Sequence, residues 1–402
     1  MFPLLLSLWG LLLVVLLILA AQPLSAEAQI ALSTSIFFSA LILMKLPRRG
    51  FFRVLFIGTV SFMVLRYITW RTTNTLPPSD DLLSFVPGLF LYLAELYAIL
   101  MFFISMFVVI DPMQRSDQPL QEGEKGDLPA VDVLVPTYDE PPYILAATLS
   151  AARRMHYPSD KLKIYLLDDG GTDEKRLASP EAVQRSELLQ EMCRSLGVNY
   201  LTRRANKNAK AGNLNAALQH TEGDLVAIFD ADHAPTKDFL QHTVGYFIKN
   251  PKLFLVQTPH FFINPDPLER SLNTFDRMPS ENEMFYGIVQ RGLDRWGASF
   301  FCGSAALLRR SALEQVGGFS GRTIVEDCET ALDLHSAGWE SVYVDRPMVA
   351  GLQPESFGSF IQQRSRWCQG MIQIFLLKNP LLKRGLNLGQ RLGYLSSNLF
   401  WF

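Results

Sequence analysis

The sequence predicts a membrane protein in which N-terminal transmembrane helices precede an α/β domain with a mostly parallel sheet. Two observations support this fold class. Hydrophobic residues make up 49% of the 402 residues, and they are concentrated in residues 1–110, where charged residues are rare. Beyond that point, short apolar runs alternate with helical patterns, which is typical of a parallel sheet covered by helices.

Four apolar segments within residues 1–110 approach the ~20 residues that a helix needs to cross a bilayer. They cover residues 2–21, 30–46, 54–70 and 89–110. Arg66 and Glu95 interrupt the last two segments. Because a charge in lipid is costly, we expect both side chains to face neighbouring helices or the interface.

Loop charges predict the orientation of these segments. Residues 45–53 carry four basic side chains, which places this link in the cytoplasm, whereas residues 72–84 carry Asp80 and Asp81 and are expected outside. The chain then re-enters, so the residues after Ile110 are expected in the cytoplasm. Ala26-Glu-Ala28 resembles a signal-peptide cleavage site, and cleavage of the first segment is a second interpretation, although no Lys or Arg precedes that segment.

A cytoplasmic α/β domain is predicted over residues 111–355. Its strand-like apolar runs are residues 131–136, 163–169 and 224–232, and helical patterns cover residues 143–155 and 181–196. Ligands of such sheets bind outside the carboxyl ends of the strands. Acidic residues stand at two of these ends, so this edge of the sheet is the candidate site.

Asp230, Asp232 and His233 follow the third apolar run. On an extended segment, residues i and i+2 project to the same side, so the two carboxylates would repel each other unless a cation lay between them. Carboxylate oxygens favour Mg²⁺ or Mn²⁺, and His233 as a nitrogen ligand would favour Mn²⁺. A surface histidine is the alternative interpretation of His233.

Other polar positions have both a functional and a structural interpretation. Asp168 and Asp169 precede two glycines and are either ligand-binding carboxylates or turn formers. Lys210 lies where a loop opens into a predicted helix, a place that suits a phosphate group or a solvated lysine. Glu326 and Asp327 begin a further predicted helix, so Asp327 is either a general base or part of an N-terminal cap.

Several protein classes are disfavoured. The formal net charge of −2 argues against a nucleic-acid binder, and the cysteines at positions 193, 302, 328 and 368 form no C-x-x-C pair for zinc. The chain lacks the G-x-G-x-x-G and G-x-x-x-x-G-K-[ST] phosphate-binding motifs. Phosphatases of the haloacid dehalogenase type share the D-x-D spacing, but they require Thr or Val where this chain has Ala234.

Residues 356–385 are predicted to form amphipathic interface helices. On a helix, Gln363, Arg366 and Trp367 share one face, and Arg364 points elsewhere. The apolar residues that follow continue a stripe, which is typical of a helix at a membrane interface. Residues 386–402 are expected to begin a further, truncated transmembrane helix, so the sequence is interpreted as a fragment.

Together these motifs resemble those of the processive family 2 glycosyltransferases, and among them the catalytic subunits of bacterial cellulose synthases. The shared motifs are LLDDGG at 166–171, FDADH at 229–233, FFCGS at 300–304, VED at 325–327 and QQRSRW at 362–367. The stretches VQTPHFFINPDP at 256–267 and NEMFYG at 282–287 are also similar. Each motif alone is weak, but the ordered set is specific.

The resemblance implies a GT-A domain that transfers glucose from UDP-glucose to the non-reducing end of a growing β-1,4-glucan, with Mg²⁺ or Mn²⁺ as cofactor. It implies a multi-pass protein of the bacterial inner membrane whose catalytic domain is cytoplasmic and whose product is exported through the lipid bilayer. It also implies a periplasmic accessory subunit, and cyclic di-GMP acting through a C-terminal domain that is absent from this chain.

The resemblance further implies residue roles, divided among the donor, the metal, the acceptor and the proton. The donor would contact Asp168, Asp169, Lys210, Asp230 and Arg366, while the metal would bind Asp230, Asp232 and His233. The acceptor glucan would contact Cys302, Gln363 and Trp367. Asp327 would be the general base.

The chain departs from the family pattern at Val325, where the family usually has Thr. It also lacks the family's remaining membrane helices and mobile gating loop. Two alternatives stay open from the sequence. One is a related synthase of another β-polysaccharide, of the hyaluronan or chitin type, and the other is a non-catalytic membrane scaffold with a glycosyltransferase fold.

Overall fold

The computed structural model describes residues 10–11, 14–46, 50–120 and 128–402. The chain forms two compact units, Met1–Asp111 and Pro112–Phe402. Each unit is described by itself below. The second unit contains all of the candidate site residues.

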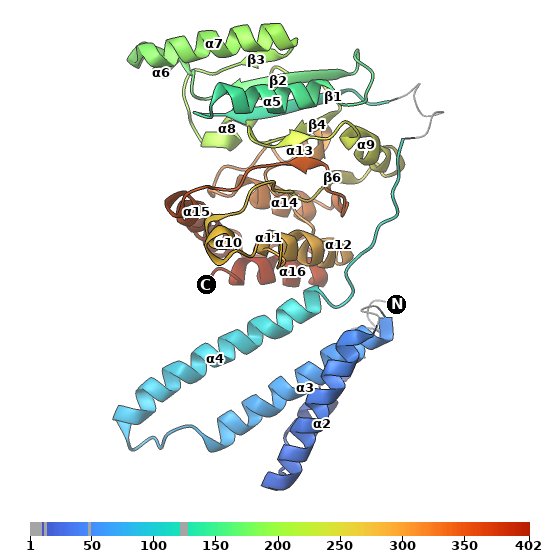
Figure 1. Ribbon diagram of the computed structural model, residues 1–402, viewed down its shortest axis with the longest axis vertical. Coiled ribbons are helices and arrows are strands. Elements are labelled where there is room, and N and C mark those ends of the chain that lie inside the picture. The colour runs from blue at the N-terminus through green and yellow to red at the C-terminus, as the bar shows by residue number, and fades with distance from the viewer. Residues whose placement is uncertain (1–9, 12–13, 47–49, 121–127) are drawn as a thin grey trace. The chain divides into compact units, whose positions relative to one another are not determined.

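The first unit consists of long apolar helices, shown in blue in Figure 1. They are α2 (Ala26–Lys45), α3 (Gly50–Asn74) and α4 (Leu82–Val108). All three are long and apolar enough to cross a membrane. They coincide with the second, third and fourth predicted segments. The first predicted segment falls partly outside the described residues, and its described residues 14–20 are helical.

The charges that interrupt these helices bind partners on their neighbours, as expected. Arg66 on α3 donates through Nε to Gln29 Oε1 of α2 at 2.5 Å and through Nη1 to the Ala20 carbonyl at 3.0 Å. Arg71 Nε lies 2.8 Å from Glu95 Oε2 of α4. These bonds offset the cost of placing charges in an apolar bundle.

The second unit is built on a seven-stranded sheet with the order β3-β2-β1-β4-β7-β6-β8. Its strands are β1 (Val131–Thr137), β2 (Leu162–Asp168), β3 (Asn199–Leu201), β4 (Leu225–Ile228), β6 (Leu253–Gln257), β7 (Ala306–Arg309) and β8 (Glu340–Tyr343), and a separate pair comprises β5 (Ala234–Pro235) and β9 (Val349–Ala350). Only β7 pairs antiparallel with its neighbours in the larger sheet. The predicted mostly parallel sheet is therefore confirmed.

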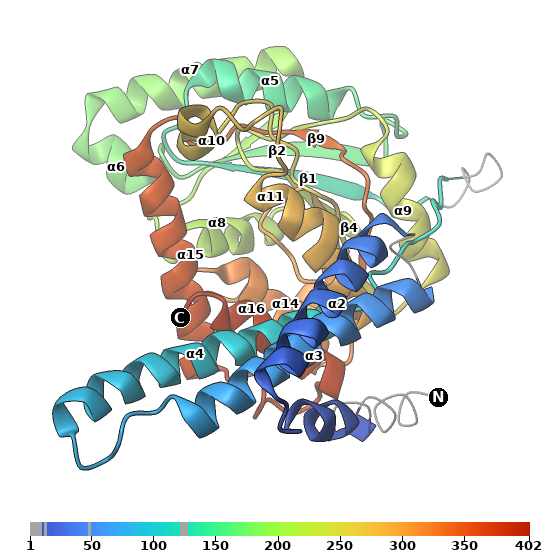
Figure 2. The ribbon, with the colours of Figure 1, turned by 60° about the horizontal axis from the view of Figure 1, so that its bottom comes forward.

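Helices connect the strands (Figures 1 and 2). Those before β7 are α5 (Pro142–Arg153), α6 (Asp173–Ala178), α7 (Pro180–Leu196), α8 (Ala209–Leu218), α9 (Phe239–Lys249), α10 (Pro267–Leu272), α11 (Glu281–Met284), the π-helix η2 (Phe285–Gln290) and α12 (Arg291–Arg295). Those after it are α13 (Arg310–Gln315), α14 (Glu326–Ser336), α15 (Phe357–Leu377) and α16 (Leu388–Leu399). The predicted helices at 143–155 and 181–196 correspond to α5 and α7.

The sheet is buried on both faces, which explains why its strands are mostly apolar. Val133 and Val135 of β1 belong to the main hydrophobic cluster, together with Leu149 of α5 and Leu189 of α7. Leu134, which points to the opposite face, is also fully buried. Alternate residues of one strand thus pack into two separate layers.

The C-terminal segment packs onto the second unit. α16 begins with a capping box between Asn387 and Gln390, and Tyr394 on this helix is fully buried, with its hydroxyl 2.7 Å from His335 Nδ1 of α14. The helix has 12 residues, whereas a membrane span needs about 20. The expectation that residues 386–402 begin a further span stays a prediction.

Candidate active site

The candidate site lies where the ends of β2 and β4 meet the segment that enters β7. β2 ends at Asp168, and β4 ends two residues before Asp230. Because β7 runs antiparallel to β4, with Ala306 opposite Ile228, residues 300–305 arrive at this same edge of the sheet. The Asp230 N–H donates to Ser304 Oγ at 2.8 Å and joins the two segments.

Asp168 and Asp169 both bind arginines of this chain. Arg185 Nη1 donates to Asp168 Oδ1 at 2.8 Å, and the Tyr200 hydroxyl donates to Asp168 Oδ2 at 2.8 Å. Arg203 donates to both oxygens of Asp169 at 2.7 Å. These bonds hold the two carboxylates in place at the end of β2. Their contact with a nucleotide stays a prediction.

Lys210 reaches from the first turn of α8 to the end of β4. Its Nζ lies 2.6 Å from Asp230 Oδ1 and donates to the Gly303 carbonyl at 2.8 Å. Burial alone would lower the pKa of Lys210, but the charges of Asp230 and Glu326 outweigh it and raise that pKa above its ordinary value. Lys210 is therefore a half-buried, paired cation and not a freely solvated side chain.

Gly303 keeps a space open between Lys210 and Asp327. A Cβ built on this glycine would lie 3.0 Å from Asp327 Oδ2 and 3.3 Å from Lys210 Nζ. Its φ of +84° is also in the left-handed region, which side chains rarely adopt. The local backbone and the space it leaves therefore both require glycine here.

Asp327 lies in the first turn of α14, next to Glu326. Its Oδ1 accepts the Cys328 N–H at 2.7 Å, so one oxygen binds the backbone of the first turn, although the N-cap residue of the helix is Val325 and not Asp327. Its Oδ2 faces Gly303. Burial, and then the negative charge of Glu326, raises the pKa of Asp327 to about 7. A carboxylate that titrates near neutral pH suits the role of a proton acceptor.

Asp230 and Asp232 lie in a turn, so the prediction that they share one side of an extended segment is wrong. β4 ends at Ile228, and the His233 N–H donates to the Asp230 carbonyl at 3.0 Å, because the chain reverses here before β5. Asp232 is half-buried and makes no side-chain hydrogen bond within the described part of the chain. Burial raises the pKa of Asp232, so a nearby cation would stabilise its ionised form.

His233 is buried, which rules out the interpretation of a surface histidine. Its Nδ1 lies 2.7 Å from Ser304 Oγ, and its ring centroid is 4.8 Å from that of His260. The described residues contain no group of three or more His, Cys, Asp or Glu side chains arranged to hold a metal ion. The two carboxylates of the turn nevertheless fit a hard divalent cation whose remaining ligands would be supplied by a diphosphate. The metal role of Asp230, Asp232 and His233 stays a prediction.

Cys302 precedes Gly303 and contacts the π-helix. Its Sγ accepts a hydrogen bond from Gln290 Nε2 at 3.1 Å, and its N–H donates to Gln257 Oε1 at 2.9 Å. Burial raises the pKa of this thiol well above its ordinary value, so Cys302 stays protonated. Its predicted contact with the acceptor is untested.

Gln363, Arg366 and Trp367 lie on α15, as predicted. Arg364, however, does not point away from them, because its guanidinium lies 4.7 Å from the Trp367 ring centroid and donates to Gln363 Oε1 at 2.7 Å. Positions i and i+3 are neighbours on a helix, and the long arginine folds over the indole. Arg366 is exposed, and its charge favours the ionised form of Glu326.

The site also contains residues that the sequence analysis missed. Arg185 and Arg203 bind the paired aspartates, and Ser304 links Asp230 to His233. Gly303 and Ser304 stand in the FFCGS motif, where only Cys302 was assigned a role. The G-S pair directly after that cysteine is the one signal that could have indicated them.

Comparisons with known proteins indicate what this chain is similar to. Glycosyl transferase family 2 matches residues 132–317, which run from β1 to two residues past α13. The cellulose synthase catalytic subunit of Xanthomonas axonopodis pv. citri is 43% identical over 98% of this chain and 52% of its own length. Over almost its whole length, this chain is thus similar to cellulose synthase catalytic subunits.

Further relatives show the same similarity. The cellulose synthase catalytic subunit of Pseudomonas fluorescens is 42% identical over 95% of this chain and 49% of its own length. Cellulose synthase 1 catalytic subunit of Komagataeibacter xylinus is 43% identical over 86% of this chain and 45% of its own length. The chain thus spans about half the length of these cellulose synthase subunits.

Among solved structures, a mannosyltransferase from Pyrobaculum calidifontis in complex with GDP-Man and Mn²⁺ aligns with 75% of this chain. The alignment covers 81% of the mannosyltransferase chain, at 20% identity and a TM-score of 0.48.

Proposed function

We propose that this chain carries the catalytic domain of a processive, inverting glucosyltransferase that extends a β-1,4-glucan from UDP-glucose. The relationship to cellulose synthase catalytic subunits supports the choice of donor and product. The observation that carries the proposal is the pairing of Asp327 with the Lys210–Asp230 ion pair across Gly303. Asp327, as the proton acceptor, and the ammonium group of Lys210 then face the same space beside Gly303.

Asp327 is proposed to accept the proton of the attacking sugar hydroxyl. The hydroxyl oxygen bonds to C1 of the donor glucose, the bond from C1 to the UDP oxygen breaks, and the hydroxyl proton passes to Asp327 Oδ2. A single displacement inverts the α-linked donor into a β-linked product. Such proton transfer contributes roughly 10²–10⁴ in rate. Because UDP leaves as an anion, the leaving group needs no proton.

The donor diphosphate is proposed to bind beside Lys210 and Arg366. Lys210 is held by Asp230 and the Gly303 carbonyl, so its charge is in place before the donor arrives. Asp168 and Asp169 are proposed to hold the uridine diphosphate end, with Arg185 and Arg203 fixing their orientation. A divalent cation, Mg²⁺ or Mn²⁺, bound by Asp230, Asp232 and His233 would neutralise charge on the diphosphate.

The acceptor glucan is proposed to contact Cys302, Gln363 and Trp367. One face of the Trp367 indole is taken by Arg364, so the sugar would stack on the other face.

The apolar helices support a membrane location. We further propose the bacterial inner membrane, a cytoplasmic catalytic domain, export of the glucan across the bilayer, a periplasmic accessory subunit, and regulation by cyclic di-GMP through a part of the protein outside this chain.

A donor comparison tests the proposed function. Membrane vesicles that contain the natural protein are given UDP-glucose or UDP-N-acetylglucosamine, and the release of UDP and of a cellulase-sensitive polymer is measured. We expect both products with UDP-glucose alone. A polymer from UDP-N-acetylglucosamine would favour the hyaluronan or chitin type of synthase. No UDP release from either donor would favour a non-catalytic scaffold.

A further inference from the structure

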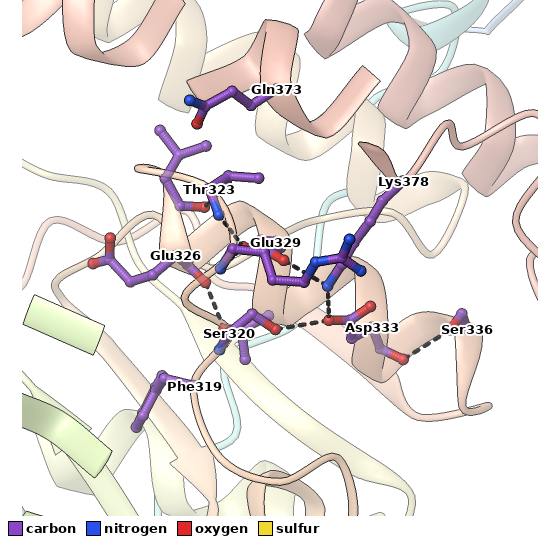
Figure 3. A network of polar contacts seen from close by, with 12 residues as sticks. Phe319, Ser320, Thr323, Glu326, Glu329, Asp333, Ser336, Gln373 and Lys378 are labelled. Carbon is purple, nitrogen blue, oxygen red and sulfur yellow. Dashed lines mark hydrogen bonds and ion pairs between the residues drawn. The ribbon is translucent and has the colours of Figure 1, made fainter. Parts of the chain in front are cut away.

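A buried carboxylate, Glu329, lies two residues after Asp327 and organises the loop that leads into α14 (Figure 3). Glu329 on α14 is fully buried. Its Oε2 accepts the N–H groups of Arg322 at 3.2 Å and Thr323 at 2.9 Å. One side chain of α14 therefore holds the backbone immediately before the helix that carries Asp327.

Two lysines that follow α15 balance the negative charges of Glu329 and Asp333. Lys378 Nζ lies 2.6 Å from Glu329 Oε1 and 2.5 Å from Asp333 Oδ2, and Lys383 Nζ lies 2.5 Å from Asp333 Oδ1. The Ser320 hydroxyl donates to Asp333 Oδ2 at 2.7 Å. Burial alone would raise the pKa of Asp333, but the bonds from both lysines hold it below its ordinary value. The two carboxylates and two ammonium groups form a neutral set.

Two contacts earlier on α15 connect it to the same loop. The Ile324 N–H donates to Gln373 Oε1 at 3.1 Å. Gly370 packs so closely on Val325 that a Cβ on the glycine would lie 2.5 Å from Val325 Cγ1. Positions 370 and 373 are neighbours on one face of a helix, and Lys378 follows directly after the last helical residue, Leu377. The C-terminal half of α15 is thereby attached to the loop at two points, and Lys378 attaches its end to Glu329 of α14.

This attachment has a consequence for the site because α15 is one continuous helix. Arg366 and Trp367 lie one turn before Gly370, so fixing the second half of α15 on the loop also fixes these two side chains. The same loop leads into α14 and Asp327. Reacting groups must be placed to within a fraction of an ångström, and a misplacement of about 1 Å can cost 10²-fold in rate.

We propose that Glu329 and Lys378 are positioning residues that set the placement of Asp327 relative to Arg366 and Trp367. The pair touches neither the donor nor the acceptor and acts through the loop at residues 320–325. This inference rests on the proposed function for its effect on catalysis, whereas its effect on the loop is independent of that function.

The test uses Lys378→Met, Glu329→Gln and the double variant in the natural protein in membrane vesicles. The measurements are kcat and KM for UDP-glucose, and amide hydrogen exchange at residues 322–324. We expect Lys378→Met to lower kcat about tenfold or more with KM changed less than about twofold, because the groups are misplaced but still present. Exchange at residues 322–324 should become faster. The double variant should be less impaired than Lys378→Met, since it leaves no unpaired charge on residue 329.

Two controls separate positioning from stability. Lys378→Arg keeps the charge and should retain most of the kcat, and Lys249→Met removes an exposed lysine at the end of α9 and should change nothing. The proposal is overturned if Lys378→Met lowers the melting temperature while kcat per folded protein and exchange at 322–324 stay as in the wild type. If the wild-type protein releases no UDP from UDP-glucose, the proposed function fails, and the exchange measurement alone then decides on the role of Glu329 and Lys378.

Discussion

Asp327 divides its two carboxylate oxygens between the helix and the site. Oδ1 accepts the Cys328 N–H, and Oδ2 faces the space beside Gly303. One side chain can thus bind the backbone in the first turn of α14 and still take the proposed role of proton acceptor. A substitution that keeps the shape of the side chain can remove one role and preserve the other.

Asp327→Asn should abolish polymer synthesis and preserve UDP binding. The amide oxygen can still accept the Cys328 N–H, but the side chain can no longer accept a proton, so we expect a loss of roughly 10²–10⁴ in kcat. Polymer formation and UDP affinity are measured in parallel. Asp160→Asn, at an exposed position, is the matched control. Wild-type activity in the Asp327 variant would remove this residue from the mechanism.

The rate should also depend on pH through Asp327. Its pKa is raised to about 7 by burial and by Glu326, and only the ionised form accepts a proton. We therefore expect kcat at saturating UDP-glucose to rise between about pH 6 and pH 8 and to fall as Asp327 is protonated at lower pH. A flat profile over this range, with the protein still folded, would contradict the assignment.

Asp232→Asn should weaken UDP binding in the presence of Mg²⁺ or Mn²⁺. The half-buried carboxylate forms no salt bridge with another described residue, so neutralising it removes a ligand that a divalent cation would use. Titration calorimetry with UDP, with and without the metal, measures the change. Unchanged affinity in Mg²⁺ and Mn²⁺ would exclude Asp232 as a metal ligand.

At the scale of elements, the approach of α15 to the loop before α14 depends on Gly370. The departure from the family pattern at Val325 lies at this contact, where its two methyl groups meet the glycine. A valine at this position gains apolar packing in place of a hydroxyl. α14 carries the candidate base, and α15 carries the QQRSRW motif. The two helices are therefore connected by close packing of apolar groups as well as by ion pairs.

Gly370→Ala should push α15 away from this loop. The added Cβ would lie 2.5 Å and 2.6 Å from the two methyl carbons of Val325, and such overpacking typically costs about 1–3 kcal/mol. We expect a lower melting temperature and a lower kcat. Val325→Ala in the same chain should restore both by making room. Gly287→Ala, where nothing lies within 4 Å of the added Cβ, is the control.

Some elements were predictable from the sequence and others were not. β1 and β2 read as mostly apolar runs because the sheet is covered on both faces, and the helices between them follow from their periodicity. The reversal of β7 carries no local signal, since its three apolar residues followed by an arginine do not indicate the direction of the strand. The turn at Asp230–His233 was missed because the apolar run continues past the last paired residue, Ile228.

The candidate site shows the same limit. Motifs that are continuous in sequence indicated Asp168, Asp230 and Asp327, but their partners come from distant segments. Arg203 binds Asp169 from 34 positions away, and Lys378 binds Glu329 from the far end of another helix. Such pairs depend on the tertiary fold, which periodicity and spacing do not contain.

At the scale of the whole molecule, the two units differ in how their apolar residues are covered. Those of the second unit lie mostly inside a packed core, whereas α2 has no buried residue at all. Long helices that expose Leu, Ile and Phe along their length need a lipid environment. The first unit is thus expected to hold the protein in the bilayer.

Alkaline carbonate extraction tests this expectation. The protein should stay in the membrane pellet, because the α2, α3 and α4 helices are held by apolar burial in lipid and not by charge. A variant without residues 1–111 should move substantially toward the supernatant. Release of the intact protein by carbonate would contradict a transmembrane arrangement.

The antiparallel direction of β7 determines which changes in chain length the protein can tolerate. Residues 300–305 enter the sheet at the same edge where β4 ends, so the position of Gly303 is set by a count of residues from Ala306, the first residue paired with β4. Inserting or deleting one residue between positions 303 and 306 would displace Gly303 from between Asp327 and Lys210. We therefore expect natural variants of this protein to differ in length in loops away from this edge and to keep the spacing from Gly303 to Ala306 unchanged.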